Sequence, residues 1–129
     1  MRIILPILMF FLLHSCSEDK DDNIDFEQRN PAPVESVEAP TSGTVGTEIE
    51  VVVNFRVYNG CGQFDRFIQE ISGTTRTIEV QAVYRGKICT QDIPLRTATY
   101  KFTPEIKGEH SLRFHAGDGE YEVVRILIE

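Results

Sequence analysis

The feature that most constrains the fold is a two-residue alternation of apolar and polar side chains, in short runs from Val34 onward. A period of two places alternate side chains on opposite faces of an extended strand, whereas a helix needs a period of about 3.6 residues. In Glu48–Val57 one face carries Ile49, Val51, Val53, Phe55 and Val57. Thr75–Tyr84 repeats the pattern with Ile78, Val80, Ala82 and Tyr84. Such strands must pack their apolar faces together, so the pattern predicts an all-β fold.

Turn residues separate these runs and set the number of strands. Gly-rich segments such as Thr41–Thr47 and Ala116–Gly119 interrupt the alternation, and the second contains Asp-Gly, a common hairpin turn. The segments between turns are the candidate strands: Val34–Val37, Glu48–Val57, Phe64–Ile71, Thr75–Tyr84, Lys87–Ile93, Arg96–Phe102, Glu109–His115 and Glu120–Ile128. We therefore predict one β-sandwich of about seven to eight antiparallel strands over residues 34–129.

The first sixteen residues have the organisation of a bacterial export signal. Met1-Arg2 precedes the apolar run Ile3–Leu13. This run of about eleven residues is too short to span a bilayer core, which needs about twenty. The run ends in Leu13-His14-Ser15-Cys16, which resembles the bacterial lipobox except at His14, where a small residue is usual. The resemblance implies that residues 1–15 are removed and that Cys16 carries a lipid anchor. An ordinary secretory signal with a chance cysteine, or a buried N-terminal strand, is the alternative.

Acidic residues follow at once in Ser17–Asp22 (SEDKDD). This segment resembles the short acidic signal that routes lipoproteins of the Bacteroidetes group to the outer leaflet of the outer membrane. The resemblance implies a surface-exposed lipoprotein, with a periplasm-facing anchor as the alternative. The same residues would also suit a plain solvated tether, because like charges repel and build no core. A calcium loop fits poorly, since the required glycine and glutamate are missing. We predict that residues 16–33, which end in Pro-Ala-Pro, form a disordered tether.

Part of the predicted sandwich resembles a known family. Thr99–Phe114 (TYKFTPEIKGEHSLRF) is similar to a strand corner of bacterial immunoglobulin-like domains, which often contain F-x-P followed by G-x-Y-x-L-x-F. Ser42–Val53 (SGTVGTEIEVVV) resembles the passage from a Gly-rich turn to a core strand in the same domains. The resemblance implies an immunoglobulin-like sandwich. The chain departs at His110, where the family usually has a tyrosine that bonds to the corner backbone, and it has no Trp. Either the imidazole makes a similar bond or the corner lacks it.

Apart from Cys16, the chain has two cysteines, Cys61 and Cys89. Exported proteins fold where disulfides form, so we predict that these two residues pair. Two buried free thiols or one reactive thiol are the alternatives, although neither a C-x-x-C spacing nor a neighbouring base supports reactivity. His110 and His115 are five residues apart, which places them on opposite faces of one strand and argues against a shared metal ion. We predict no metal site and no cofactor.

The net charge of −7 argues against nucleic-acid binding and against a polybasic membrane patch, since both require a basic face. No nucleophile motif or other catalytic constellation is visible, so we predict that the protein is not an enzyme. The most distinctive string is Tyr58–Phe64 (YNGCGQF), in which glycines flank the cysteine. Loops on a stiff scaffold often carry recognition, which makes Tyr58, Asn59, Gln63 and Phe64 candidate partner-binding residues. A tight turn pinned by the disulfide is the alternative.

Together these features predict a membrane-anchored, cell-surface lipoprotein that acts as a non-enzymatic binding module. The expected partners are the membrane, through the lipid, and an envelope protein or a polysaccharide. A structural accessory subunit of a larger envelope complex is the main alternative, and a small inhibitor or hydrolase is a third. A recognition module should expose aromatic side chains at one end. An accessory subunit should instead show a flat apolar patch or a bare strand edge at Glu120–Ile128 or Val34–Val37.

Overall fold

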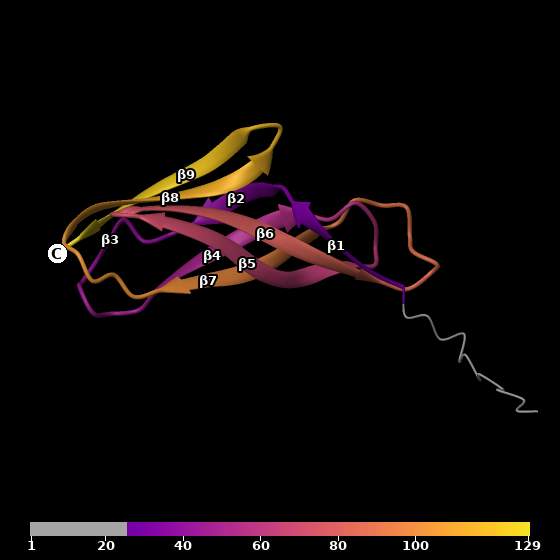
Figure 1. The fold of residues 1–129 in the computed structure, drawn as a ribbon, viewed down its shortest axis with the longest axis horizontal. Coiled ribbons are helices and arrows are strands. Elements are labelled where there is room, and N and C mark those ends of the chain that lie inside the picture. The colour runs from indigo at the N-terminus through magenta and orange to yellow at the C-terminus, as the bar shows by residue number, and fades with distance from the viewer. Residues whose placement is uncertain (1–25) are drawn as a thin grey trace, which may run out of the picture.

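Nine strands and no helix make up residues 26–129, the part of the chain that the computed structural model describes (Figure 1). The predicted signal peptide, the predicted lipidation site Cys16 and the acidic run Ser17–Asp22 lie outside these residues. Within the described part, no segment has both the length and the apolar character of a membrane-crossing helix.

The larger of the two sheets contains β1 (Glu27–Ala32), β3 (Ser42–Gly43), β5 (Gly62–Ser72), β6 (Thr75–Arg85), β8 (Gly108–Gly117) and β9 (Glu120–Ile128). Strand β6 pairs along one side with β5. Its other side is shared, because β1 pairs antiparallel with Val80–Arg85 while β8 pairs in parallel with Thr75–Ile78. The sheet therefore forks at Glu79, where the pairing with β8 ends and that with β1 begins.

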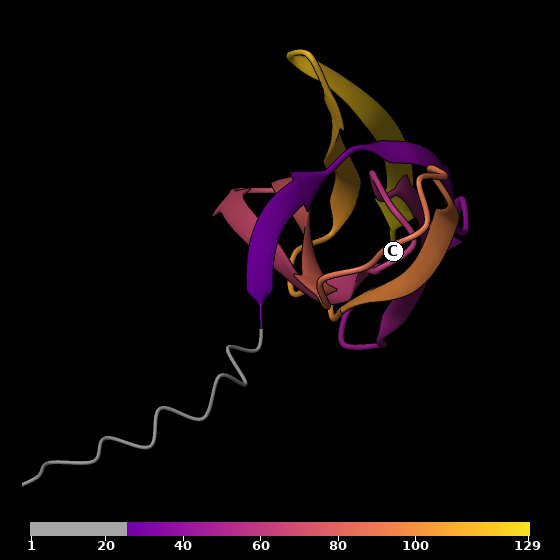
Figure 2. The same ribbon diagram turned by 90° about the vertical axis from the view of Figure 1, so that its right-hand side faces the viewer.

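The smaller sheet contains β2 (Val34–Glu38), β4 (Ile49–Arg56) and β7 (Leu95–Phe102). Strand β4 lies in the middle and pairs antiparallel with both neighbours. The chain passes from the larger sheet to the smaller one at Pro33, between β1 and β2. Figure 2 looks along the long axis and shows the two layers surrounding the interior, with the β8–β9 hairpin standing away from the body.

The core lies between the sheets and is formed by the alternating faces that the sequence predicts. The five inward side chains of Glu48–Val57 and the four of Thr75–Tyr84 are each at most 5% exposed. Strands β8 and β9 add His110, Leu112, Phe114, Ile126 and Ile128, and β7 adds Tyr100 and Phe102. Burying these apolar faces is the main source of stability in such a domain. The predicted all-β sandwich is confirmed, with nine strands where seven to eight were expected.

His110 occupies the corner position where the resembling family has a tyrosine. Its ring is 3% exposed, and Nε2 lies 2.6 Å from the carbonyl oxygen of Ile106, four residues earlier. A carbonyl only accepts hydrogen bonds, so Nε2 is the donor, and Nδ1 is left buried without a partner. The imidazole thus makes the bond to the corner backbone that the tyrosine would make. His115 lies on the other face of β8 and is half-buried, as the odd spacing predicts.

Three predictions of the strand map are wrong. The tether does not extend to Pro33, because Glu27–Ala32 is a strand held by its ladder with β6. Lys87–Ile93 forms a loop instead of a strand, since Gly86 turns the chain at a φ of 114° and no neighbouring strand pairs with the segment. The sandwich is not wholly antiparallel, because β6 pairs with β8, and β3 with β9, in parallel. Strand β7 intervenes between β6 and β8 in the other sheet, so the chain returns by a crossover.

Candidate functional site

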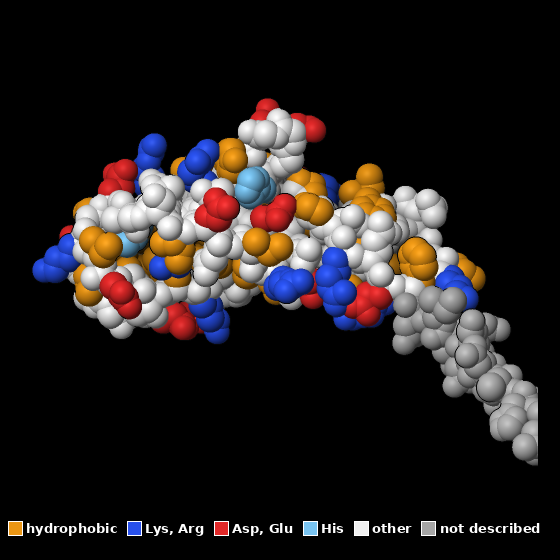
Figure 3. Space-filling view, in the orientation of Figure 1, with side chains coloured by type: hydrophobic (Ala, Val, Ile, Leu, Met, Phe, Trp, Pro, Cys, Tyr) orange, Lys and Arg blue, Asp and Glu red, His pale blue; other side chains and the backbone are white. Residues whose placement is uncertain are grey.

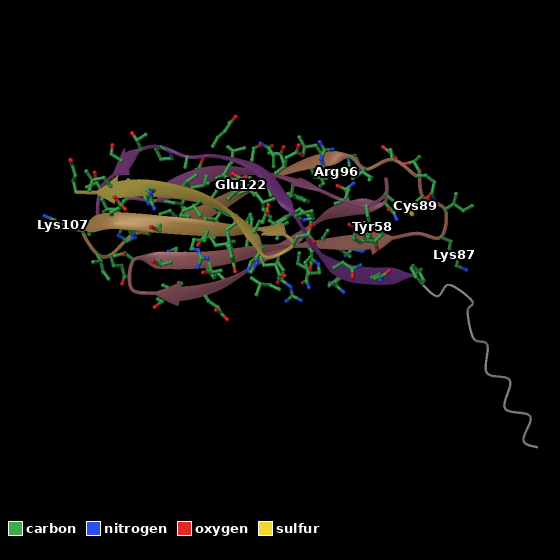
Figure 4. All side chains as sticks on the ribbon, turned by 90° about the horizontal axis from the view of Figure 1, so that it is seen from above. Tyr58, Lys87, Cys89, Arg96, Lys107 and Glu122 are labelled. Carbon is green, nitrogen blue, oxygen red and sulfur yellow. A yellow bond between two sulfur atoms is a disulfide. The ribbon has the colours of Figure 1, made fainter. Side chains whose placement is uncertain are left out.

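The sequence-predicted recognition loop lies between β4 and β5, at the end of the sandwich where β1 begins (Figure 4). The Tyr58 ring stacks on Tyr84 at 3.9 Å between centroids and remains 48% exposed. Its hydroxyl accepts a hydrogen bond of 3.0 Å from Nδ2 of Asn30 in β1. Tyr58 is therefore a rigid surface aromatic that braces β1 against the loop.

The other three residues of this predicted set serve different purposes. Asn59 forms the turn itself, since its Oδ1 accepts the N–H of Cys61 at 2.9 Å and its carbonyl accepts the N–H of Gly62. Gln63 is exposed. Phe64 packs inward against Phe55 and Phe67 at 6.0 and 4.7 Å between centroids, so the structure does not present it to a partner. The prediction that all four residues form one exposed contact is wrong for Phe64, because β5 begins at Gly62 and gives residue 64 the inward parity.

Cys61 and Cys89 form a disulfide, with an S–S distance of 2.01 Å, which confirms the predicted pairing. The bond joins the turn at residue 61 to the loop of residues 86–94. The two loops also share a 3.0 Å bond from the N–H of Gly60 to the carbonyl of Thr90. They approach so closely that a Cβ on Gly60 would lie 1.8 Å from Oγ1 of Thr90. A side chain at position 60 would therefore force Thr90 to move.

Arg96 also holds the turn around Cys61 in place. Its guanidinium donates to the carbonyl oxygens of Gly62 at 3.0 Å and Gly60 at 3.2 Å. A guanidinium satisfies several acceptors in fixed directions, so this side chain holds the backbone of the turn in one arrangement. The disulfide, Arg96 and the Gly60 contact together make this end of the sandwich stiff. We call it the disulfide end.

The disulfide end exposes apolar side chains that the sequence analysis missed. Ile88, one residue before Cys89, is 96% exposed, and Figure 3 shows hydrophobic side chains gathered at the end where β1 begins. Three further large apolar side chains here are about half exposed: Phe26, Ile93 and Leu95. The sequence concealed this tip, because the expected strand over Lys87–Ile93 would place an isoleucine in the core.

Two titratable groups at this end have shifted pKa values. Burial raises the pKa of the Tyr84 hydroxyl above its ordinary value, although the N–H that Tyr58 donates to it acts in the opposite direction. A hydrogen bond from Thr90 lowers the pKa of the exposed Asp92 carboxyl, assisted by its own backbone N–H. Asp92 is therefore a carboxylate at neutral pH. Within residues 26–129, no three His, Cys, Asp or Glu side chains lie close enough to hold a metal ion.

A second surface arises at the fork of the larger sheet. Beyond Phe114, β8 no longer pairs with β6, and the β8–β9 hairpin projects from the body of the domain (Figures 1 and 2). Its turn uses positive φ at Gly117, Asp118 and Gly119, as expected for a tight hairpin. A pocket of about 410 Å³ opens between the hairpin and the passage from β1 to β2, lined on opposite walls by Pro31–Pro33 and His115–Gly119.

The outer edge of β9 has no strand beside it over Glu120–Ile126 among the described residues. The N–H of Leu127 points to this side, where it bonds Thr41 of the segment leading into β3. Backbone groups alternate in direction along a strand, so the N–H and C=O of Tyr121, Val123 and Arg125 point to the same side. No strand pairs with these groups in the described part of the chain. The bare edge named in the sequence analysis is therefore present at β9.

The two facing sheets around a single apolar core define a β-sandwich domain as the class of this protein. The comparison with protein families identifies it further. Residues 51–125 match the family described as the ORF11 beta-sandwich domain. The match spans more than half of the chain, from β4 to β9, and the chain belongs to this family. Comparisons with curated proteins and with solved structures found no match.

Proposed function

We propose that this protein is a lipid-anchored, non-enzymatic interaction module of the bacterial cell surface, and that it binds another envelope protein along β9. The observation that carries the proposal is the bare edge of the projecting β8–β9 hairpin. Backbone donors and acceptors on an exposed edge accept an extended segment of a second protein as an additional strand. A polypeptide matches this row of alternating donors and acceptors, which favours a protein partner over a polysaccharide.

The surroundings of the edge support this use. Val123 is 46% exposed and Leu127 49% exposed, so an added strand would find apolar side chains to pack on. Across the hairpin, the guanidinium of Arg113 lies over the Tyr121 ring at 4.1 Å. This contact stiffens the projecting part and presents the edge in a defined direction. Glu120 and Glu122 flank the edge and favour a partner segment with basic residues.

The proposed anchor is the lipid on Cys16. Its support is the lipobox-like string Leu13–Cys16 after an apolar run of signal-peptide length. The acidic run Ser17–Asp22 supports export to the outer surface. Replacing Cys16 with Ala should leave an unlipidated precursor, and replacing Glu18–Asp22 with neutral residues should remove accessibility to protease on intact cells. If the neutralised protein is still cleaved on intact cells, the surface-export part of the proposal is wrong.

The edge itself is tested by Val123→Pro. Proline removes the outward N–H of residue 123 and leaves the ladder to β8 intact, because that N–H takes no part in it. We expect the variant to lose the partner that crosslinking and pull-down of the intact lipoprotein recover from its native envelope. Val123→Thr keeps the N–H and the branched shape, so it should retain the partner. Equal recovery with both variants, each folded by circular dichroism, would contradict the proposal.

A second candidate is a structural accessory subunit, bound permanently in a larger envelope complex. The bare β9 edge is the feature that the sequence analysis associates with this second function, so the edge alone does not separate the two. The apolar side chains of Val123 on the edge and Leu127 at its end also favour a permanent interface, because permanent interfaces are more hydrophobic than transient ones. The two functions differ in stoichiometry. An accessory subunit copurifies with its partner in a fixed ratio through extended washing, whereas a transient module is recovered only after crosslinking.

A further inference from the structure

The disulfide end has a stiff loop with an apolar tip, beside the point where the described chain enters the domain. The proposed interface on β9 does not involve this loop. The first described residue, Phe26, accepts the N–H of Gly86 through its carbonyl at 3.2 Å. Strand β1 starts opposite Arg85, with Glu27 paired to it. The N-terminal part of the chain therefore meets the domain at the base of the loop of residues 86–94.

The tip of this loop is held outward. Ile88 is 96% exposed, and the disulfide of the next residue ties the loop to the turn at Cys61. The hydrogen bond from Gly60 to Thr90, and the close contact between these two residues, fix the part of the loop that follows Cys89. An exposed isoleucine normally lowers its contact with water by folding back, but these restraints keep Ile88 extended. Such a preorganised apolar tip loses little conformational entropy when it binds.

The charges around the tip suit a lipid surface. Lys87 is the cation at the tip, because the guanidinium of Arg96 is bound to the carbonyls of Gly60 and Gly62 and Arg85 pairs with Glu27 at the base of the loop. Lys87 precedes Ile88 and projects at the same end of the molecule as Cys89 (Figure 4). A lysine beside an inserted apolar residue places its ammonium among the headgroups while its stem lies along the acyl region. Neighbouring Ile93, Leu95 and Phe26 widen the apolar area.

The length of chain between Cys16 and Phe26 keeps this end of the domain within reach of the bilayer. Ten residue steps separate Cys16 from Phe26, which span at most about 35 Å when fully extended. We infer that the loop of residues 86–94 inserts Ile88 into the membrane interface beside the lipid anchor, and so orients the domain. This inference rests on the proposed lipidation of Cys16. Lipidation makes insertion an intramolecular event, so a small apolar tip suffices at the high effective concentration that a short tether provides.

The chain has no Trp, so a single introduced tryptophan reports on one place. The test uses the lipidated full chain bearing Ile88→Trp, reconstituted in phosphatidylglycerol and phosphatidylethanolamine vesicles. We expect a blue-shifted emission and at least a twofold loss of intensity when the acyl chains are brominated. The matched control is Ile106→Trp, since Ile106 is 52% exposed in the corner next to Lys107, at the opposite end from Lys87 (Figure 4). Its emission should not change.

The outcomes separate the inference from the proposed function. A chain that fails to float with vesicles contradicts the lipid anchor itself. If the Ile88→Trp chain floats but its tryptophan is not quenched, or if the two variants are quenched equally, the insertion is overturned. An Ile88→Trp emission that shifts only when a second envelope protein is added also overturns it and assigns the tip to that protein.

The unmodified chain gives an independent check. Trypsin cleavage after Lys87 should slow at least fivefold on vesicles relative to detergent, while cleavage after Lys107 is unchanged. Equal rates of cleavage at Lys87 in both settings would overturn the insertion.

Discussion

Removing the disulfide should destabilise the domain by an amount that its position in the chain sets. Cys61 and Cys89 are 28 residues apart, and closing a loop of that size restricts the unfolded chain. The loop-closure relation gives a contribution of about 3.5 kcal/mol. A domain of this size has a total stability of about 5–15 kcal/mol, so the double variant Cys61→Ala/Cys89→Ala should stay folded with a much smaller margin.

Urea unfolding followed by circular dichroism measures the effect. With a slope of about 1–3 kcal/mol/M, the loss corresponds to a fall of about 1.2–3.5 M in the midpoint. Dithiothreitol should lower the midpoint of the unmodified protein to that of the double variant and leave the variant unchanged, which is the internal control. Equal midpoints for the oxidised protein and the variant would refute the reasoning, and would mean that the Gly60–Thr90 bond and Arg96 hold the two loops without the covalent link.

Three further changes probe the core and the corner. His110→Phe should lower the free energy of unfolding by about 1 kcal/mol, because it leaves the Ile106 carbonyl without its donor; urea unfolding with His115→Phe as the surface control checks this. Phe114→Ala should cost about 3–5 kcal/mol as a cavity opens in the core, whereas Val123→Ala should cost less than about 0.5 kcal/mol, and equal losses would contradict the burial pattern. Burial raises the pKa of Tyr84, so its contribution to stability is complete below the unfolded value of about 10 and is lost as pH rises through the folded value. Tyr84→Phe should therefore flatten the alkaline part of a plot of stability against pH, and an unchanged slope would argue against the shift.

Local patterns predicted the parts of the fold that local physics determines. The inward faces of β4 and β6 follow from strict alternation, because any other register would expose a row of large apolar side chains. The disulfide followed from two cysteines in a chain with a predicted export signal. The histidine at the corner makes its backbone bond because the F-x-P corner brings residue 106 under residue 110.

Pairing between distant segments could not be predicted in the same way. Strand β1 (EQRNPA) shows no alternation of apolar and polar residues. It is held by backbone pairing with the free edge of β6, and the sequence of β1 does not reveal this pairing. The parallel pairing of β6 with β8 depends on the crossover through β7. Phe64 faces inward because β5 starts two residues before it, and a register shift follows between Phe64 and Arg66. Element boundaries and bulges of this kind decide which side chains reach the surface.

The apolar tip was missed, and the projection of the β9 edge was not foreseen, for related reasons. Ile88 looks like a core residue in sequence, and only the restraint of its neighbours makes it a tip. The bare edge of β9 was considered in advance, but its projection from the body depends on the fork at Glu79, where one strand gives way to another. Such a division of one strand edge between two neighbours leaves no mark in composition or periodicity.

The position of β1 has a mechanical consequence. Any pull transmitted from an anchor enters the domain at Phe26 and runs along β1, nearly parallel to its ladder with β6 (Figure 1). Force in that direction loads all six residue pairs of the ladder in shear, so they must rupture together instead of unzipping one by one. Beyond Pro33 the same segment becomes β2, which carries the tension into the second sheet. With the proposed surface anchor, drag on the domain would pass through both sheets at once, and the rate at which β1 is stripped from β6 would set its resistance.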